Sequence, residues 1–140
     1  DEEHNVLDGQ QHGHPINDLK QVANLEHLVD LQRDLGNVHV DRTVTNYLLR
    51  LVRATRTLPE VALGASTRGS LALHRASQAL AALRGRDFVL PDDVKELATS
   101  ILAHRILVAS EFGLRGITAE SLVHSLVEST ELNLVDEDRD

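Results

Sequence analysis

Aliphatic side chains recur at the 3.6-residue spacing of an α-helix in three separate stretches of this 140-residue chain. Helices with one apolar face bury that face against one another, so the pattern favours a helical bundle. Apolar residues make up 41% of the chain and aromatic residues only 2%, a composition that suits packed helices better than sheets. We therefore expect an all-α fold of five to six helices. The periodic positions are Val44, Tyr47, Leu48, Leu51 and Val52, then Val94, Leu97, Ala98, Ile101 and Leu102, then Leu122, Val123, Leu126 and Val127.

Residues typical of helix starts precede all three stretches. Asp41 and Thr118 are preferred N-cap types, and Pro91 is suited to the first helical position. A weaker helix is expected from Asn24, as N-cap, to Leu35, with Gly36 as a left-handed C-terminal glycine.

An Ala-rich stretch over residues 70–83 predicts a further helix, with Ser66 as a candidate cap before it and Gly85 after it. Two short hydrophobic pieces, Val38–Val40 and Phe88–Val89, are spaced to pair as a minimal two-stranded ribbon. The face expected to be buried on the Ala-rich helix consists of Ala72, Ala76, Ala79, Leu80 and Leu83.

Charge is unevenly distributed along the chain, whose 22 acidic and 14 basic residues give a net charge of −8. Residues 1–41 carry 9 acids and 2 bases, residues 42–105 carry 5 acids and 10 bases, and residues 106–140 carry 8 acids and 2 bases. Nine of the ten central bases are arginine, which suits contacts to phosphate. The acidic total argues against a nucleic-acid partner, whereas the basic middle leaves room for a local anion site.

Several classes of protein are disfavoured by what the sequence lacks. Without cysteine there is no disulfide or thiolate metal site, and no apolar run approaches the ~18 residues of a membrane span. No signal peptide is visible, so we expect a cytoplasmic protein without a membrane partner. The absence of Met at position 1 suggests an excised piece of a longer chain.

The segment from Leu63 to Ser70 is the strongest candidate for a binding site. If Ser66 caps the following helix, Arg68 lies in the first turn, where backbone N–H groups and the helix dipole favour an anion. Gly64 and Gly69 would allow close approach, and a phosphate is the natural ligand. The local pattern is equally compatible with an ordinary helix whose Arg68 pairs with a nearby acid.

Other motifs fit their chemistry poorly. Gly64 and Gly69 have P-loop spacing, but Ser70 and Leu71 occupy the places of the lysine and the Ser/Thr. The eight histidines, including His4, His12 and His14, show no metal-binding spacing, so no metal site is expected. The pair Asp92 and Asp93 follows Pro91, where compensation of the helix dipole is favoured over acid–base catalysis.

Several ordered segments together resemble the C-terminal lid of MoxR-type AAA+ ATPases, from about Asp1 to about Val127. The segments are Tyr47–Arg56, Val61–Gly69, Gly85–Val94 and His104-Arg105. The resemblance implies an AAA+ lid bundle over residues 13–130, preceded at 1–12 by the end of the ATPase core or a linker helix. An acidic tail over 131–140, expected to be disordered, would follow.

The resemblance also implies roles for individual residues. Arg68 would be the second sensor, which touches nucleotide phosphates, with Gly64 and Ser66 shaping its turn. Thr67 stands where the family usually has proline, which leaves the start of the helix less rigid. Arg56 and Arg105 would form intersubunit or lid–core ion pairs.

At the level of the whole protein, the resemblance implies ATP and Mg²⁺ bound by the lid's own core domain, in a homo-oligomeric, hexameric ring that remodels or activates client proteins. The chain itself lacks Walker A and B motifs, so it is not expected to bind a cofactor or to catalyse hydrolysis alone. Two alternatives remain open from the residues: a helical DNA-binding or protein-adaptor module using the basic middle, and a stand-alone enzyme or metal protein using the histidines.

Overall fold

The computed structural model of the chain describes residue 4 and residues 15–132. Internal contacts divide the chain into two compact units, Asp1–Gln32 and Arg33–Asp140, which are described separately. The predicted core end or linker at 1–12 lies outside the described residues, apart from His4, as does all of the predicted acidic tail beyond residue 132.

The first unit contains the 3₁₀ helix η1 (Pro15–Asp18) and most of helix α2 (Leu25–Asp34). The predicted cap of α2 is confirmed, because Asn24 Oδ1 accepts a 2.8 Å hydrogen bond from the His27 N–H. The prediction of a left-handed Gly36 is wrong, since the only described glycines with positive φ are Gly85 and Gly116. The chain instead continues into the 3₁₀ helix η2 (Leu35–Asn37), so α2 needs no left-handed residue to end.

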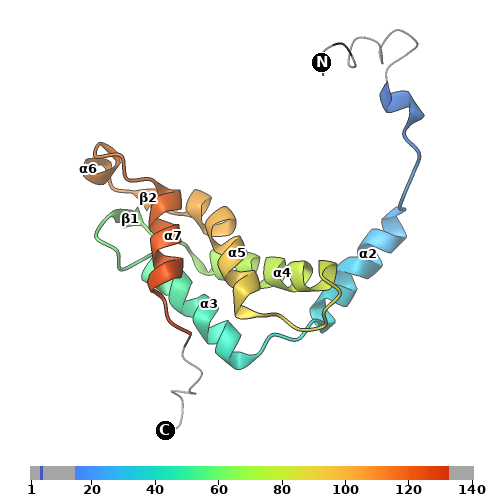
Figure 1. Cartoon of the computed structure of the whole chain (residues 1–140), viewed down its shortest axis with the longest axis horizontal. Helices are drawn as coiled ribbons and strands as arrows, with labels where there is room; N and C mark the ends of the chain where they lie inside the picture. Colours follow the sequence, from blue (N-terminus) through green and yellow to red (C-terminus); the bar gives the residue numbers. More distant parts are fainter. Residues whose placement is uncertain (1–3, 5–14, 133–140) are drawn as a thin grey trace. The chain divides into compact units, whose positions relative to one another are not determined.

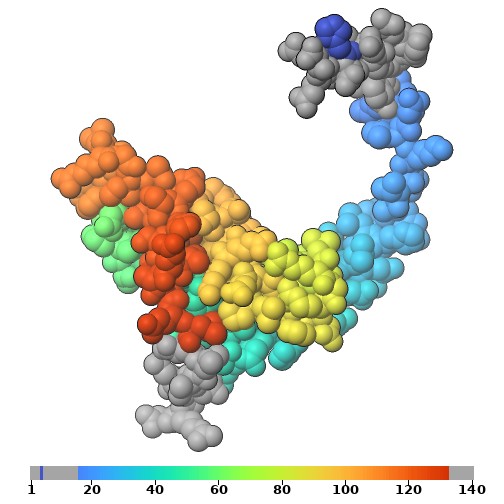
Figure 2. All heavy atoms as spheres, viewed as in Figure 1, coloured from blue at the N-terminus to red at the C-terminus, as the bar shows by residue number. Residues whose placement is uncertain are grey.

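Four helices form the framework of the second unit: α3 (Arg42–Ala54), α4 (Thr67–Leu83), α5 (Pro91–Leu102) and α7 (Ala119–Ser129). They are joined by the 3₁₀ helix η3 (Ala103–Arg105) and the short α6 (Ser110–Gly113). Figure 1 shows α5 beside both α4 and α7, and Figure 2 shows α7 lying across the visible face next to α5. The expected mainly helical fold is confirmed, and its buried core includes Val44, Tyr47, Leu48, Leu51, Val52, Leu73, Val94, Ala98, Leu102 and Val123.

The predicted starts of three helices are also confirmed. The Asp41 side chain accepts a hydrogen bond from the Thr43 N–H, and Thr118 does the same for Ser121. Pro91 occupies the first position of α5, where its missing N–H costs nothing.

Helix α4 forms as predicted but buries a different face. Its buried stripe includes Gly69, Leu73 and Ala81, whereas the predicted Leu83 is 85% exposed and the predicted alanines are only half-buried. The buried stripe also contains two polar residues, Ser77 and Gln78, so the pattern of apolar residues in the sequence did not reveal it. Ser77 Oγ donates to the Leu73 carbonyl, and Gln78 Nε2 donates to the Val38 carbonyl at 2.8 Å, so both are hydrogen-bonded when buried.

The predicted ribbon is present as a single parallel bridge between His39 and Phe88. The His39 N–H donates to the Asp87 carbonyl at 2.8 Å, and the Val89 N–H donates to the His39 carbonyl at 2.9 Å.

A small antiparallel sheet was not predicted. It joins β1 (Val61–Leu63) to β2 (Leu107–Val108), with Val61 opposite Val108 and Leu63 opposite Leu107 (Figure 1). Strands of three and two residues are too short for an alternating pattern to be recognised in sequence. The sheet places the segment leading into α4 beside the segment that follows η3.

Candidate functional site

Arg68 lies in the first turn of α4, where the sequence places it. Ser66 is the N-cap with an extended backbone, Thr67 is the first helical residue and Arg68 the second. The Arg68 side chain is exposed and forms no hydrogen bond or ion pair with any described residue. The Ser66 hydroxyl makes no capping hydrogen bond, so Ser66 contributes its backbone conformation alone.

The residue before Ser66 is held through both of its backbone polar groups. Thr55 Oγ1 accepts a 3.0 Å hydrogen bond from the Ala65 N–H and donates at 2.7 Å to the Val52 carbonyl. Arg56 Nε donates at 2.7 Å to the Ala65 carbonyl. Thr55 and Ala65 are completely buried. The residues at the end of α3 therefore hold the backbone of Ala65, three residues before Arg68, in place.

Gly64 supports this arrangement by its lack of a side chain. A Cβ at Gly64 would lie 2.6 Å from Arg56 Cγ, 2.7 Å from Arg56 Cα and 2.8 Å from the Thr55 carbonyl oxygen. Backbone atoms cannot yield as a flexible side chain can, so only glycine allows this approach to the end of α3.

Arg105, the last residue of η3, lies close to the first turn of α4. A Cβ added at Gly69 would be 3.6 Å from Arg105 Cδ. Arg105 Nη1 donates a hydrogen bond to the Ile101 carbonyl and contacts the His104 ring. Within the described residues, Arg56 and Arg105 both bond to backbone carbonyls, and neither forms an ion pair. The structure thus brings Gly64, Ser66 and Arg68 together with these two arginines close by.

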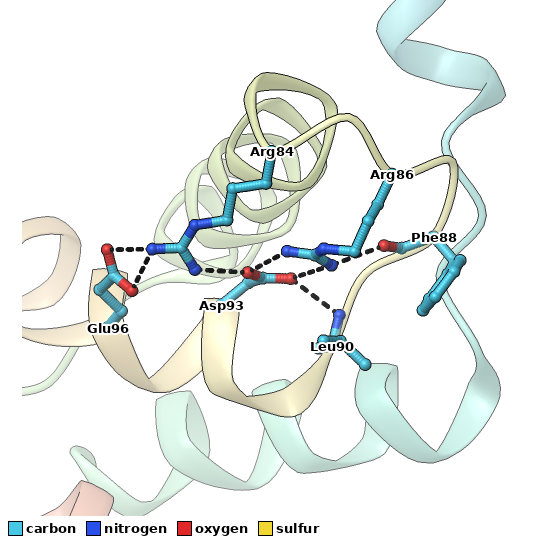
Figure 3. Close-up of polar contacts among 6 residues, drawn as sticks. All are labelled: Arg84, Arg86, Phe88, Leu90, Asp93 and Glu96. Carbon is cyan, nitrogen blue, oxygen red and sulfur yellow. Dashed lines mark hydrogen bonds and ion pairs between the residues drawn. The ribbon is translucent and has the colours of Figure 1, made fainter.

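A second polar cluster, not predicted from the sequence, joins the end of α4 to the start of α5 (Figure 3). Asp93 is 1% exposed and accepts hydrogen bonds from Arg86 at 2.7 and 2.8 Å, from Arg84 at 3.1 Å and from the Leu90 N–H at 2.8 Å. Arg84 also binds both oxygens of Glu96, at 2.7 and 2.9 Å. An acid at the third position after the N-cap was the available sequence signal.

The charge of Asp93 is maintained by its hydrogen-bond donors. Burial raises the pKa of this carboxyl, but hydrogen bonds from Arg86, the Leu90 N–H and Arg84, together with the charge of Arg86, outweigh burial and lower the pKa. Asp92 instead pairs with Lys95 at 3.3 Å. Both carboxylates are therefore engaged in ion pairs at a helix start. Their predicted compensation of the helix dipole stays a prediction.

Two further sequence expectations concern metals and membranes. No group of three or more His, Cys, Asp or Glu residues able to hold a metal ion occurs in the part of the chain that the structure describes. His12 and His14 lie outside that part. Over the same residues, no helix combines the length and apolar character needed to cross a bilayer.

Comparison with known proteins agrees with the architecture. Residues 53–126 match the family described as the AAA lid domain. The chain is 40% identical over 131 residues to the uncharacterized protein YeaC of Bacillus subtilis, covering 94% of the chain and 41% of YeaC. It is 33% identical over 123 residues to Chaperone MoxR1 of Mycobacterium tuberculosis, covering 81% of the chain and 32% of MoxR1.

A solved structure shows the same arrangement of elements. The crystal structure of a candidate ATPase from Cytophaga hutchinsonii superimposes with a TM-score of 0.74 and 29% identity, over 77% of this chain and 36% of that one. The chain thus spans only about a third to two fifths of each of these proteins. On the family match, the chain belongs to the AAA lid domain family, and these similarities relate it to the MoxR-type AAA+ ATPases.

Proposed function

We propose that this lid senses the phosphates of ATP bound to its ATPase core, and that Arg68 makes the contact. The observation that carries the proposal is an exposed arginine in the first turn of a 17-residue helix, without a partner among the described residues. Contact with phosphate would couple the orientation of the lid to hydrolysis in the core.

The alternative explanation, an ion pair between Arg68 and a nearby acid of the lid, finds no support among the described residues. A cation in the first turn opposes the helix dipole, so it is unfavourable unless an anion is supplied. A phosphate would satisfy the guanidinium and the first backbone amides together. One charge-assisted hydrogen bond contributes about 1.5–3 kcal/mol, which is enough to bias a two-state lid by an order of magnitude.

The proposal extends to the whole protein. ATP and Mg²⁺ would bind to the core, and the lid would comprise residues 13–130, with residues 1–12 as the end of the core or a linker. The remaining nitrogens of Arg56 and Arg105 would form lid–core or intersubunit ion pairs in a hexameric, cytoplasmic ring. A relative named as a chaperone supports a role in remodelling or activating client proteins.

The test uses the protein in which this lid is joined to its core, called the lid–core protein below. Arg68→Ala removes the proposed contact, and Arg68→Lys keeps the charge but loses the bidentate geometry. We expect ATP turnover at saturating ATP to change severalfold in the alanine variant, with the lysine variant between it and the wild type. Wild-type turnover and ATP affinity in both variants would refute the assignment.

A further inference from the structure

The segment before Arg68 is hydrogen-bonded by two consecutive side chains at the end of α3. Thr55 Oγ1 accepts from the N–H of Ala65, and Arg56 Nε donates to its carbonyl oxygen. Turns are usually closed by backbone hydrogen bonds or local side chains. Here the two bonding side chains, Arg56 and Thr55, lie nine and ten positions before Ala65, so the hydrogen bonds are tertiary contacts.

We propose that Thr55 and Arg56 are positioning residues for Arg68, an inference that rests on the proposed function. Together with Gly64, they form what we call the Ala65 clamp. The clamp would set where α4 begins relative to α3, and so where the Arg68 guanidinium meets a phosphate.

Three features of the clamp make it rigid. Thr55 is completely buried and also donates to the Val52 carbonyl, which fixes the direction of its hydroxyl hydrogen toward α3 and leaves the oxygen lone pairs for Ala65. The Arg56 hydrogen bond has a charged donor, and such bonds are shorter and stronger than neutral ones. Gly64 lies so close to the Arg56 backbone that the loop has no room to move toward α3.

The clamp is also anchored in the core. Leu51 and Val52, one turn before Thr55, are at most 1% exposed. A displacement of Ala65 would therefore have to break buried hydrogen bonds or move α3 itself. Only Ser66 and Thr67 lie between Ala65 and Arg68, so fixing Ala65 also restricts where the backbone of Arg68 lies.

Thr55 offers the cleaner test because a completely buried side chain cannot touch nucleotide. Thr55→Val removes the hydroxyl at nearly constant volume, and Thr55→Ser restores it. Thr57→Val is the matched control, since the exposed Thr57 hydroxyl donates only to the Ala54 carbonyl. ATP affinity of the lid–core protein is measured well below each variant's melting temperature, alone and combined with Arg68→Ala.

The expected result is a Kd for ATP about two- to tenfold weaker in Thr55→Val, the range equivalent to one lost hydrogen bond. Affinity should be recovered in Thr55→Ser and unchanged in Thr57→Val. In the Arg68→Ala background, Thr55→Val should have no further effect, because a residue acting through Arg68 is silent once Arg68 is gone.

The outcomes separate the two proposals. If Arg68→Ala weakens ATP binding but Thr55→Val does not, or weakens it by the same factor in both backgrounds, the clamp is not a positioning device. If Arg68→Ala itself binds ATP normally, the sensor function is lost and the clamp role falls with it. Should Thr55→Val fail to fold, Arg56→Gln replaces it as the test variant, with Arg53→Gln, at an exposed arginine in the last turn of α3, as its control. ATP affinity is then measured in the wild-type and Arg68→Ala backgrounds, with the same expected and contradicting results.

Discussion

Asp93 keeps its charge in the interior because it accepts four hydrogen bonds, two of them from Arg86. Arg84 and Arg86 lie just after α4, and the Leu90 N–H comes from the residue before α5. Removing one partner of a buried ion pair is more costly than the pair itself is stabilising, since the remaining charge loses its compensation. The cluster therefore links the segment after α4, which ends at Leu83, to α5, which begins at Pro91.

Stability should depend on pH through this residue. A lowered pKa means that the unfolded chain binds a proton more readily than the folded chain. The stabilisation is thus present above about pH 4, where an unfolded Asp is ionised, and is lost as pH falls through the lower folded pKa. Urea unfolding of the chain between neutral and acid pH should show this decline.

The matched variants are two neighbouring aspartates. Asp93→Asn should lower the free energy of unfolding at pH 7 by about 2 kcal/mol and flatten its dependence on acid pH. Asp92→Asn, at an 81% exposed side chain paired with Lys95, should cost less than about 1 kcal/mol. Equal losses in the two variants, or an unchanged pH profile in Asp93→Asn, would show that the cluster does not carry the charge-dependent stability.

Gly64→Ala tests the close approach of the loop to α3. The added Cβ would overlap Arg56 Cγ, Arg56 Cα and the Thr55 oxygen, so we expect a loss of about 1–3 kcal/mol, typical of overpacking. Gly113→Ala is the control, because nothing lies within 4 Å of its Cβ position and its φ is not positive. A Gly64→Ala chain as stable in urea as Gly113→Ala would mean that the loop relaxes freely.

At the scale of single residues, the position of Arg68 in a first turn followed from local pattern. Gly64 was expected to let an anion approach, whereas the structure shows that its missing Cβ leaves room for the Arg56 backbone and the Thr55 carbonyl. The Ala65 clamp did not follow from local pattern, because its contacts obey no spacing rule. In the Asp93 cluster only the contact between Asp93 and the Leu90 N–H has a spacing signal, and the contacts with the two arginines have none. The Ser66 hydroxyl shows the limit of the residue-type argument: the N-cap position was right, yet its side chain makes no capping hydrogen bond.

Helices were predictable where apolar periodicity and capping residues agreed. For α3, α5 and α7 both signals pointed to the same residues, and all three formed. Helix α4 formed with a buried face that includes Ser77 and Gln78, and hydrophobicity alone could not find it. Gly36 was misread because α2 ends through a 3₁₀ turn, and β1 and β2 are too short to leave a signal.

The N-cap residues of α4 and α7 should contribute differently to the stability of the chain. Thr118 accepts a hydrogen bond from the Ser121 N–H at 3.2 Å, whereas Ser66 makes no side-chain cap bond. Thr118→Ala should therefore destabilise the chain by about 1 kcal/mol, and Ser66→Ala by a few tenths at most. The melting temperatures of the two variants check this order, and the reverse order would contradict the capping geometry.

For the molecule as a whole, the second unit combines a helical framework with an exposed cation at the start of its longest helix. The net charge of −8 disfavours polyanionic surfaces, while the basic middle contains Arg68. In the function proposed above, this cation needs an anion that the core supplies. The proposed sensing role can therefore be tested only in the lid–core protein.

The most direct test of this account is the affinity of the lid–core protein for ATP after Arg68→Ala, compared with Arg75→Ala. Arg75 is also exposed and lies two turns further along α4, so it controls for loss of charge. The account predicts binding weakened by about tenfold or more in Arg68→Ala, the equivalent of one charge-assisted hydrogen bond, and near-wild-type binding in Arg75→Ala. Equal affinities in the two variants would contradict it.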